Sequence, residues 1–227
     1  MKLLEQYSYR TPTAWRPQIH LMSEETIGFY SASFSWGEID LGEKAFENVR
    51  IFVEAALNQS EVTNPFGINE SLTSLENALL SGCSLANSVI YRLINGSSLS
   101  SGIEGLWMVK QSKELAMAHI GQPQVYLFRE NHLVPLFAAT DFVAKPLSRG
   151  PFLPNKMLGL FAHTHMNIQS LSIEKGDQLI LLAHSFTPKG LFDSIHSNQT
   201  LDLKIIYNKI VQEYAQCPFW ISRYQVI

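Results

Sequence analysis

Histidines are the first residues with which this sequence could bind a metal ion. His163 and His165 are separated by one residue, a spacing that puts both imidazoles on one face of a strand, and His184 follows further along the chain. Three histidines can bind zinc. We favour the alternative that all three are strand-edge or surface histidines with ordinary hydrogen bonds.

Three acids form a second potential group of metal ligands. Glu38, Asp40 and Glu43 lie together in one short segment, and carboxylates are preferred ligands of hard divalent cations. A helix is expected to begin near Glu43, where an acid also complements the positive end of the helix dipole. We therefore expect Glu43 to be a helix-start residue, with an acidic metal cluster as the lesser alternative.

Covalent chemistry has little support in the sequence. Ser185 lacks a histidine and an acid in the arrangement of a hydrolase triad. Cys83 lies in an apolar helical run, far in sequence from Cys217, and is expected to be a small buried hydrophobe. His119 is expected to be a strand residue with no catalytic role.

The composition is that of a folded chain without strong affinity for polyanions. Of 227 residues, 46% are hydrophobic and 16% are charged, and the net charge is −3. Such a chain can fill a core and has no positive field to attract nucleic acid or an anionic membrane. It has no apolar run of the ~20 residues that cross a bilayer, and Glu5 and Gln6 interrupt any signal peptide. We expect one domain over residues 1–227, soluble and cytoplasmic.

Hydrophobic periodicity predicts a mixture of helices and short strands. Apolar residues recur every three or four positions over residues 43–58, 72–94 and 201–215, which predicts helices. Thr73 and Glu76 form a capping-box pattern at the start of the second helix. Strands are expected over residues 25–36, 106–110, 114–120, 125–129, 132–137, 166–173, 178–183 and 219–226. This order predicts an α+β fold with helices on the faces of mostly antiparallel sheets.

Five segments carry family motifs in the correct order. Residues 118–133 follow A-x-V-G-D-S-R-x-Y-L-x-R-x-G-x-L, residues 173–186 follow L-x-x-G-D-x-L-L-L-C-S-D-G, and residues 29–45 follow F-A-V-A-D-G-M-G-G-H-x-x-G-E-x-A. Two shorter matches are Leu158-Gly159 with A-L-G and Leu85-Ala86-Asn87 with a helical A-N. Through these segments the chain resembles the metal-dependent serine/threonine protein phosphatases, the PPM or type 2C family.

The resemblance implies a particular architecture. In this family two antiparallel sheets form a sandwich, which is flanked by a pair of antiparallel helices on each outer face. Aspartates at one end of the sandwich hold two metal ions. The proline-rich segment 141–154 falls where the family often carries a variable flap beside the active site, so it is an expected contact region.

The positions of those aspartates hold other residues here. The D-G pair of the first motif falls on Phe34 and Ser35, the hairpin aspartate on Gln122, and the aspartate of S-D-G on Ser185. The N-terminal arginine of the family is matched by Arg16, but the acids that follow it in the family are absent.

Charge explains why these replacements matter. Two divalent cations ~4 Å apart repel each other and need several carboxylates to stay bound. Neutral amide and hydroxyl oxygens coordinate metals without compensating this charge, and Phe34 does neither. Without a metal, water keeps a pKa of ~15.7 instead of roughly 7, so forming hydroxide costs about 12 kcal/mol. The resemblance therefore implies that the metal cofactors and the phosphatase reaction have been lost.

The expected function is that of a pseudophosphatase, a protein-interaction or regulatory module of bacterial type with a protein partner and no cofactor. Trp36, Phe186 and Phe34, with Gln122, would give the former cleft an aromatic, uncharged surface suited to a partner. Equally, Phe34 and Phe186 could fill the emptied metal cavity.

Two other functions stay open. One is an active phosphatase with a reorganised metal set. The other is a sensor in which Arg16 or Arg10 binds phosphate or a phosphopeptide without hydrolysis.

Overall fold

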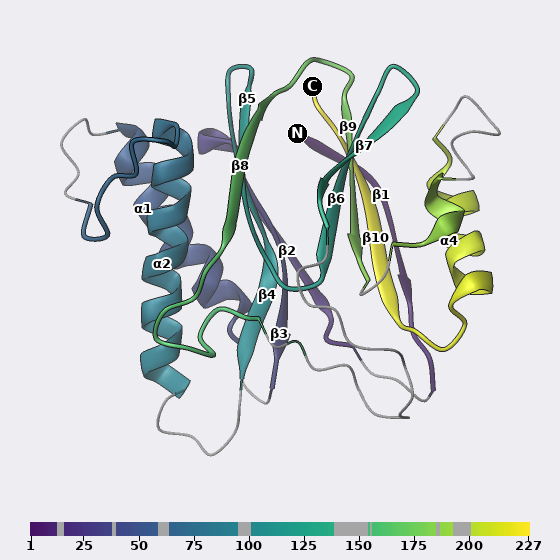
Figure 1. Cartoon of the computed structure of the whole chain (residues 1–227), viewed down its shortest axis with the longest axis horizontal. Helices are drawn as coiled ribbons and strands as arrows, with labels where there is room; N and C mark the ends of the chain where they lie inside the picture. The colour runs from purple at the N-terminus through teal and green to yellow at the C-terminus, as the bar shows by residue number, and fades with distance from the viewer. Residues whose placement is uncertain are drawn as a thin grey trace. The chain divides into compact units, whose positions relative to one another are not determined.

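The computed structural model describes residues 1–12, 16–37, 40–58, 64–94, 101–138, 154, 156–184, 187–192 and 201–227. These residues form two compact units, each with one five-stranded antiparallel sheet (Figure 1). The first unit comprises residues 1–16, 122–154 and 173–227, and the second comprises residues 17–121 and 155–172. The predicted α+β class with antiparallel sheets is confirmed, whereas a single domain over residues 1–227 stays a prediction.

Two long helices cover the sheet of the second unit. Its strands are β2 (Ile19–Glu24), β3 (Phe29–Trp36), β4 (Gly102–Gln111), β5 (Glu114–Ile120) and β8 (Asn167–Ser172), in the spatial order β2-β3-β4-β5-β8. Helices α1 (Gly42–Asn58) and α2 (Ser74–Ile94) lie side by side against this sheet (Figure 1).

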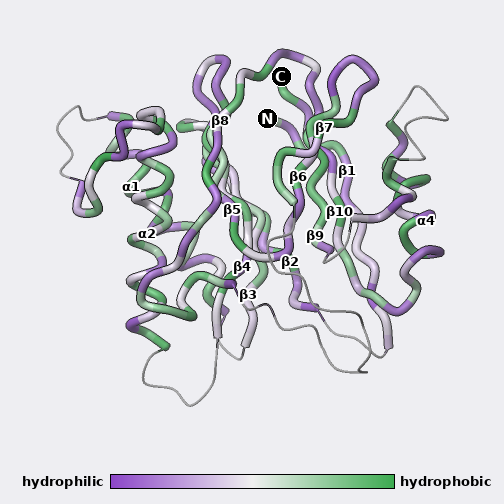
Figure 2. The backbone as a smooth tube through the Cα atoms, in the orientation of Figure 1, coloured by the Kyte–Doolittle hydropathy of each residue, from purple (hydrophilic) through white to green (hydrophobic). Residues whose placement is uncertain are grey.

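Amphipathic patterns explain why these helices form. Hydrophobic and hydrophilic residues alternate along them (Figure 2), and Phe46 of α1 shares a buried core with Leu79 and Ile90 of α2. Gly82 lets the helices approach closely, because a Cβ there would lie 3.1 Å from the carbonyl oxygen of Val49. In the described part of the chain, no helix combines the length and the apolar character needed to cross a membrane.

The predicted capping box at the start of α2 is confirmed. The Thr73 hydroxyl accepts a hydrogen bond from the Glu76 N–H at 3.2 Å, and the Glu76 carboxylate accepts one from the Thr73 N–H at 2.7 Å. Thr73 is therefore the cap, and the helix predicted over residues 72–94 begins at Ser74.

One helix packs on the sheet of the first unit. Its strands are β1 (Lys2–Tyr9), β6 (Pro123–Arg129), β7 (His132–Phe137), β9 (Gln178–Ala183) and β10 (Phe219–Gln225), in the order β1-β10-β9-β6-β7. Helix α4 (Leu203–Glu213) contacts β1 and β10, and residues 189–192 add one helical turn. The implied second long helix of this unit is not found among the described residues.

Other predicted elements are present with shifted ends. The strand predicted over residues 25–36 begins at Phe29, because the 3-10 helix η1 (Glu25–Ile27) precedes it and ends at Gly28 with φ 65°.

Sequence patterns do not predict β1 and β2. A bulge between Leu3 and Glu5 interrupts the alternation of β1, and β2 is an edge strand without alternating burial.

Two motif positions of the first unit are joined by an ion pair. β6 and β7 meet at a tight turn, where Glu130 and Asn131 both have positive φ (51° and 63°). Arg129 Nε donates to Asp177 Oδ1 at 2.8 Å, and the buried Asp177 also accepts from the Glu174 N–H. Burial alone would raise the pKa of Asp177, but the hydrogen bonds from Arg129 and Glu174 outweigh it and hold that pKa below its usual value.

Replacing Arg129 by alanine should lower the free energy of unfolding by about 2 kcal/mol at neutral pH, because the buried Asp177 loses its ionic partner. A carboxylate with a depressed folded-state pKa stabilises the fold above its unfolded pKa, and this contribution disappears as the pH falls through the folded pKa. The difference between wild type and Arg129→Ala should therefore shrink on acidification, as measured by urea unfolding at several pH values. Arg92→Ala, at an exposed position on α2, is the control. A loss that is the same at every pH would contradict this assignment.

Candidate functional site

The first motif lies on β3 and leads toward α1. Phe34 is 1% exposed and Trp36 is 2% exposed. The Ser35 hydroxyl accepts a hydrogen bond from the Leu41 N–H at 2.9 Å, which ties the end of β3 to the segment before α1. The burial of Phe34 and Trp36 favours space filling over partner contact for these two predicted residues.

The acids expected near the first motif have structural roles. Asp40 Oδ1 accepts a hydrogen bond from the Gly42 N–H at 3.0 Å and lies 3.3 Å from His20 Nε2. The His20 ring packs on Gly42, where a Cβ would come within 2.8 Å of it. Glu43 is exposed in the first turn of α1, as predicted. Glu38 lies outside the described residues.

The first unit brings together two of the predicted site residues. Arg16 Nη1 donates a hydrogen bond to Gln122 Oε1 at 2.8 Å. Gln122 is fully buried and Arg16 is half-buried. The amide at the motif's aspartate position thus binds the arginine that was expected to contact phosphate. Ser185 and Phe186 lie outside the described residues.

A buried network follows Gln122, and the sequence analysis missed it. Gln124 Nε2 donates to the His184 carbonyl at 2.6 Å, and its Oε1 accepts from the Tyr126 hydroxyl at 2.6 Å and the Thr187 hydroxyl at 3.0 Å. Burial raises the pKa of Tyr126, so its hydroxyl stays protonated and donates at neutral pH. The sequence signal that could have indicated this network is the pair Gln122 and Gln124, two glutamines at a spacing of two where a largely apolar strand begins.

Glu104 is a second residue that the sequence analysis missed. It is fully buried in β4, and its Cα pairs in register with that of Phe34 on β3. A Cβ on Gly121 would lie 2.8 Å from Glu104 Oε2, so the carboxylate lies against the residue that precedes Gln122 in the chain. The strand predicted over residues 106–110 excluded Glu104, which hid its burial.

The preferred interpretation of His163 and His165 as surface residues is confirmed, because both are exposed and precede β8, which begins at Asn167. His184, by contrast, is buried. In the part of the chain that the structure describes, no three histidine, cysteine, aspartate or glutamate residues lie close enough together to hold a metal ion. His119 is a buried strand residue of β5, as predicted, with its Nδ1 3.4 Å from Asn167 Nδ2.

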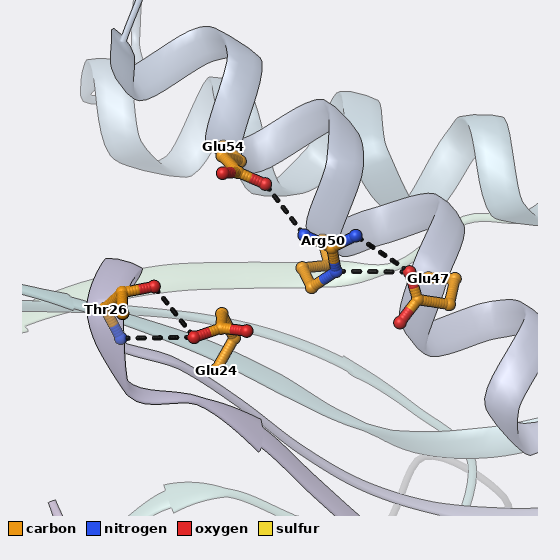
Figure 3. A network of polar contacts seen from close by, with 5 residues as sticks. All are labelled: Glu24, Thr26, Glu47, Arg50 and Glu54. Atoms are coloured by element: carbon orange, nitrogen blue, oxygen red, sulfur yellow. Dashed lines mark hydrogen bonds and ion pairs between the residues drawn. The ribbon is translucent and has the colours of Figure 1, made fainter.

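Acids of α1 and of the turn after β2 are held by local partners (Figure 3). Arg50 binds Glu47 at 2.9 Å and Glu54 at 2.7 Å, and the hydrogen bond to Glu47 raises the pKa of the guanidinium. Glu24 accepts hydrogen bonds from the N–H and the hydroxyl of Thr26. These carboxylates form surface ion pairs and a turn cap, and they do not converge on a cation site.

Two short motif matches meet in the second unit. Asn87 of α2 accepts a hydrogen bond from the Gly159 N–H at 2.8 Å and donates to the carbonyl oxygens of Phe161 and Ala162, both at 3.1 Å. Gly159 has φ 85°, a backbone conformation that side-chain-bearing residues rarely adopt, and a Cβ there would also clash with Ile90. Asn87 thus fastens the segment that leads to β8.

Both cysteines have the environment of packing residues. Cys83 and Cys217 are buried and are not in a disulfide. Burial raises the pKa of both thiols, so neither forms a thiolate readily at neutral pH. The expectation of a buried Cys83 is confirmed.

Solved structures similar to this chain include serine/threonine phosphatases. It matches the PPM Ser-Thr phosphatase MsPP from Mycobacterium smegmatis with 13% identity over 100% of both chains and a TM-score of 0.61. It matches the catalytic domain of the serine/threonine phosphatase PstP, solved with 2 manganese ions, with 15% identity over 98% of this chain and 97% of that one, at a TM-score of 0.58.

A third match is to PppA, a key regulatory component of the T6SS in Pseudomonas aeruginosa, with 11% identity, coverage of 98% and 96%, and a TM-score of 0.60. No protein-family model and no curated protein matches the sequence. The chain therefore has the fold of the PPM serine/threonine phosphatases, as the motif resemblance implied.

Asn87→Ala should lower the free energy of unfolding by about 2 to 3 kcal/mol, because it removes three hydrogen bonds and leaves the buried Gly159 N–H unpaired. Asn48→Ala, at a half-buried asparagine of α1 whose side chain donates one hydrogen bond, to the Lys44 carbonyl, among the described residues, should change it by less than about 0.5 kcal/mol. Urea unfolding of both variants measures the two changes in the free energy of unfolding. Equal changes would show that Asn87 does not hold residues 159–162 in place.

Proposed function

We propose that this chain is a catalytically inactive phosphatase-like protein that acts as a protein-interaction or regulatory module. One observation carries the proposal: the residues at the motif's metal-ligand positions supply no negative charge, and the three that the structure describes are engaged within the protein. Phe34 is buried, Ser35 binds the Leu41 N–H, and Gln122 binds Arg16. PstP, which has the same fold, was solved with 2 manganese ions, and such a pair needs several carboxylates.

The position of Arg16 adds a direct electrostatic obstacle to metal binding. A cation bound to Gln122 Oε1 would lie about 4 Å from the guanidinium that donates to the same oxygen. Repulsion between charges of +2 and +1 at that distance is about 2 kcal/mol at the dielectric constant of water and about 8 kcal/mol at an effective value of 20. Gln122 therefore serves as a partner for Arg16 and is a poor metal ligand.

Hydrogen bonds support a metal-free arrangement of the first unit. Gln124 binds His184 and Thr187, the described residues on either side of Ser185 and Phe186. The Arg16–Gln122 hydrogen bond joins two side chains and holds the residue before β6 against Arg16. Two side-chain amides thus connect segments that belong to the motifs, and these hydrogen bonds require no ion.

A regulatory role has the support of one structural neighbour. PppA is described as a key regulatory component of its secretion system. We extend from it only the idea that a protein of this fold serves regulation, and we propose that this chain does so by contact with a protein partner.

The purified protein should neither bind manganese in a saturable way nor hydrolyse p-nitrophenyl phosphate above the buffer rate, because it lacks the carboxylates that compensate two divalent ions. Isothermal titration with MnCl₂ and a colorimetric assay with added manganese measure the two properties. PstP, treated identically, is the positive control. Stoichiometric manganese together with hydrolysis that EDTA abolishes would instead establish an active phosphatase with a reorganised metal set.

A second function has one specific observation in its favour. Arg16 is half-buried, and its guanidinium donates to the amide oxygen of Gln122, a group that brings no negative charge of its own. A phosphate or a phosphopeptide could bind such a group without being hydrolysed.

If Arg16 binds phosphate, Arg16→Ala should weaken binding of inorganic phosphate at least about tenfold, the value of one charge-assisted hydrogen bond. Titration calorimetry measures the affinity, and Arg92→Ala, at an exposed position on α2, is the matched control. Equal affinities in wild type and Arg16→Ala would exclude Arg16 as the sensor residue.

A further inference from the structure

The connection between α1 and α2 has exposed apolar side chains on a backbone that is held in place by hydrogen bonds. Residues 64–67 form a turn in which Asn64 Oδ1 accepts hydrogen bonds from the Phe66 N–H at 3.0 Å and from the Ser81 hydroxyl of α2 at 2.9 Å. Phe66 is 47% exposed and Ile68 is 75% exposed. This connection therefore carries two exposed apolar side chains close together in the chain.

Asn77 of α2 fastens the second half of this connection. Its Oδ1 accepts from the Asn69 N–H at 2.9 Å, and its Nδ2 lies 3.0 to 3.2 Å from the carbonyl oxygens of Asn69, Leu72 and Thr73. Asn77 is buried, so these bonds are shielded from water. Because the backbone is already ordered, a partner that covers Ile68 loses little conformational entropy in doing so.

A hollow of about 360 Å³ lies beside this connection. It is lined by Phe52 and Ala56 of α1, by Asn64, Ile68, Asn69, Glu70 and Leu72 of the connection, and by Ser74, Asn77 and Ala78 of α2. Its volume is at the lower end for ligand sites and suits one or two side chains of a peptide.

Charge and hydrogen-bonding capacity indicate the kind of occupant. Among the described lining residues, Glu70 is the one charged residue, and none of them is a lysine or arginine that could neutralise it. The amide NH₂ groups of Asn64 and Asn69 have no acceptor in the part of the chain that the structure describes, so they can donate to peptide carbonyls. The hollow thus favours an apolar anchor next to a basic side chain.

We propose that this hollow binds a peptide segment of a partner protein that inserts an aliphatic side chain between Phe52 and Leu72 and places a lysine or arginine against Glu70. Ile68 covers the inserted side chain. The proposal rests on the proposed function in one respect: it names the kind of partner that an interaction module would bind. It is spatially independent of the first motif, because Ala56 is about 21 Å along α1 from Gly42.

The probe is a set of synthetic pentapeptides with the sequence Gly-Lys-X-Arg-Gly, where X is leucine, isoleucine or serine, together with Gly-Glu-Leu-Glu-Gly. The leucine and isoleucine peptides should shift the backbone amide NMR signals of residues 64–78 in the full chain at millimolar concentration. The serine peptide and the acidic peptide should bind at least about tenfold more weakly.

Variants of the protein test the same contacts. Ile68→Ser should weaken binding of the leucine peptide about tenfold, and Glu70→Lys should weaken it about three- to tenfold. Ile51→Ser, at an exposed isoleucine of α1 outside the lining, and Glu130→Lys, in the β6–β7 turn, are the matched controls and should bind as wild type does.

Absence of shifts with every peptide, shifts confined to other residues, or equal binding by Ile68→Ser and wild type would overturn the proposal. Each of these outcomes leaves the manganese and hydrolysis measurements unaffected. Failure of this docking site is therefore distinguishable from failure of the pseudophosphatase assignment.

Discussion

The compensation of positive charge is the constraint on which the account depends. A fold that holds two divalent ions must place several carboxylates around them, and without those carboxylates the ions repel each other and leave. Here the motif positions carry an aromatic ring, a hydroxyl and an amide, and the amide binds a guanidinium. A positive side chain now occupies the neighbourhood in which a cation would need negative charge.

Polar side chains hold the motif segments in place. Buried Gln124 and Asn87 and half-buried Ser35 bind backbone groups elsewhere in the chain: Gln124 binds His184, Asn87 binds the segment after Leu158, and Ser35 binds Leu41. Each such bond contributes modestly, but losing one partner leaves a buried group unsatisfied, which costs more than the bond contributes. The arrangement of these loops is therefore set by the protein itself.

The elements with regular periodicity could be predicted from the sequence. α1 and α2 have strong three- and four-residue spacing, and the capping box marks the start of the second, while β5, β7 and β9 have the predicted ends. β1 could not be predicted, because its bulge at Leu3 and Glu5 breaks the period of two. The motif positions of Phe34 and Gln122 could be found by resemblance, whereas the burial of Glu104 depends on pairing between strands distant in sequence.

The loss of the metal pair can be tested with a crystal of the protein grown with manganese and measured at the manganese absorption edge. If the metal site is lost, the crystal should contain no pair of ordered anomalous peaks bound to the protein. Two well-ordered manganese ions bound together would show that the metal site has been kept.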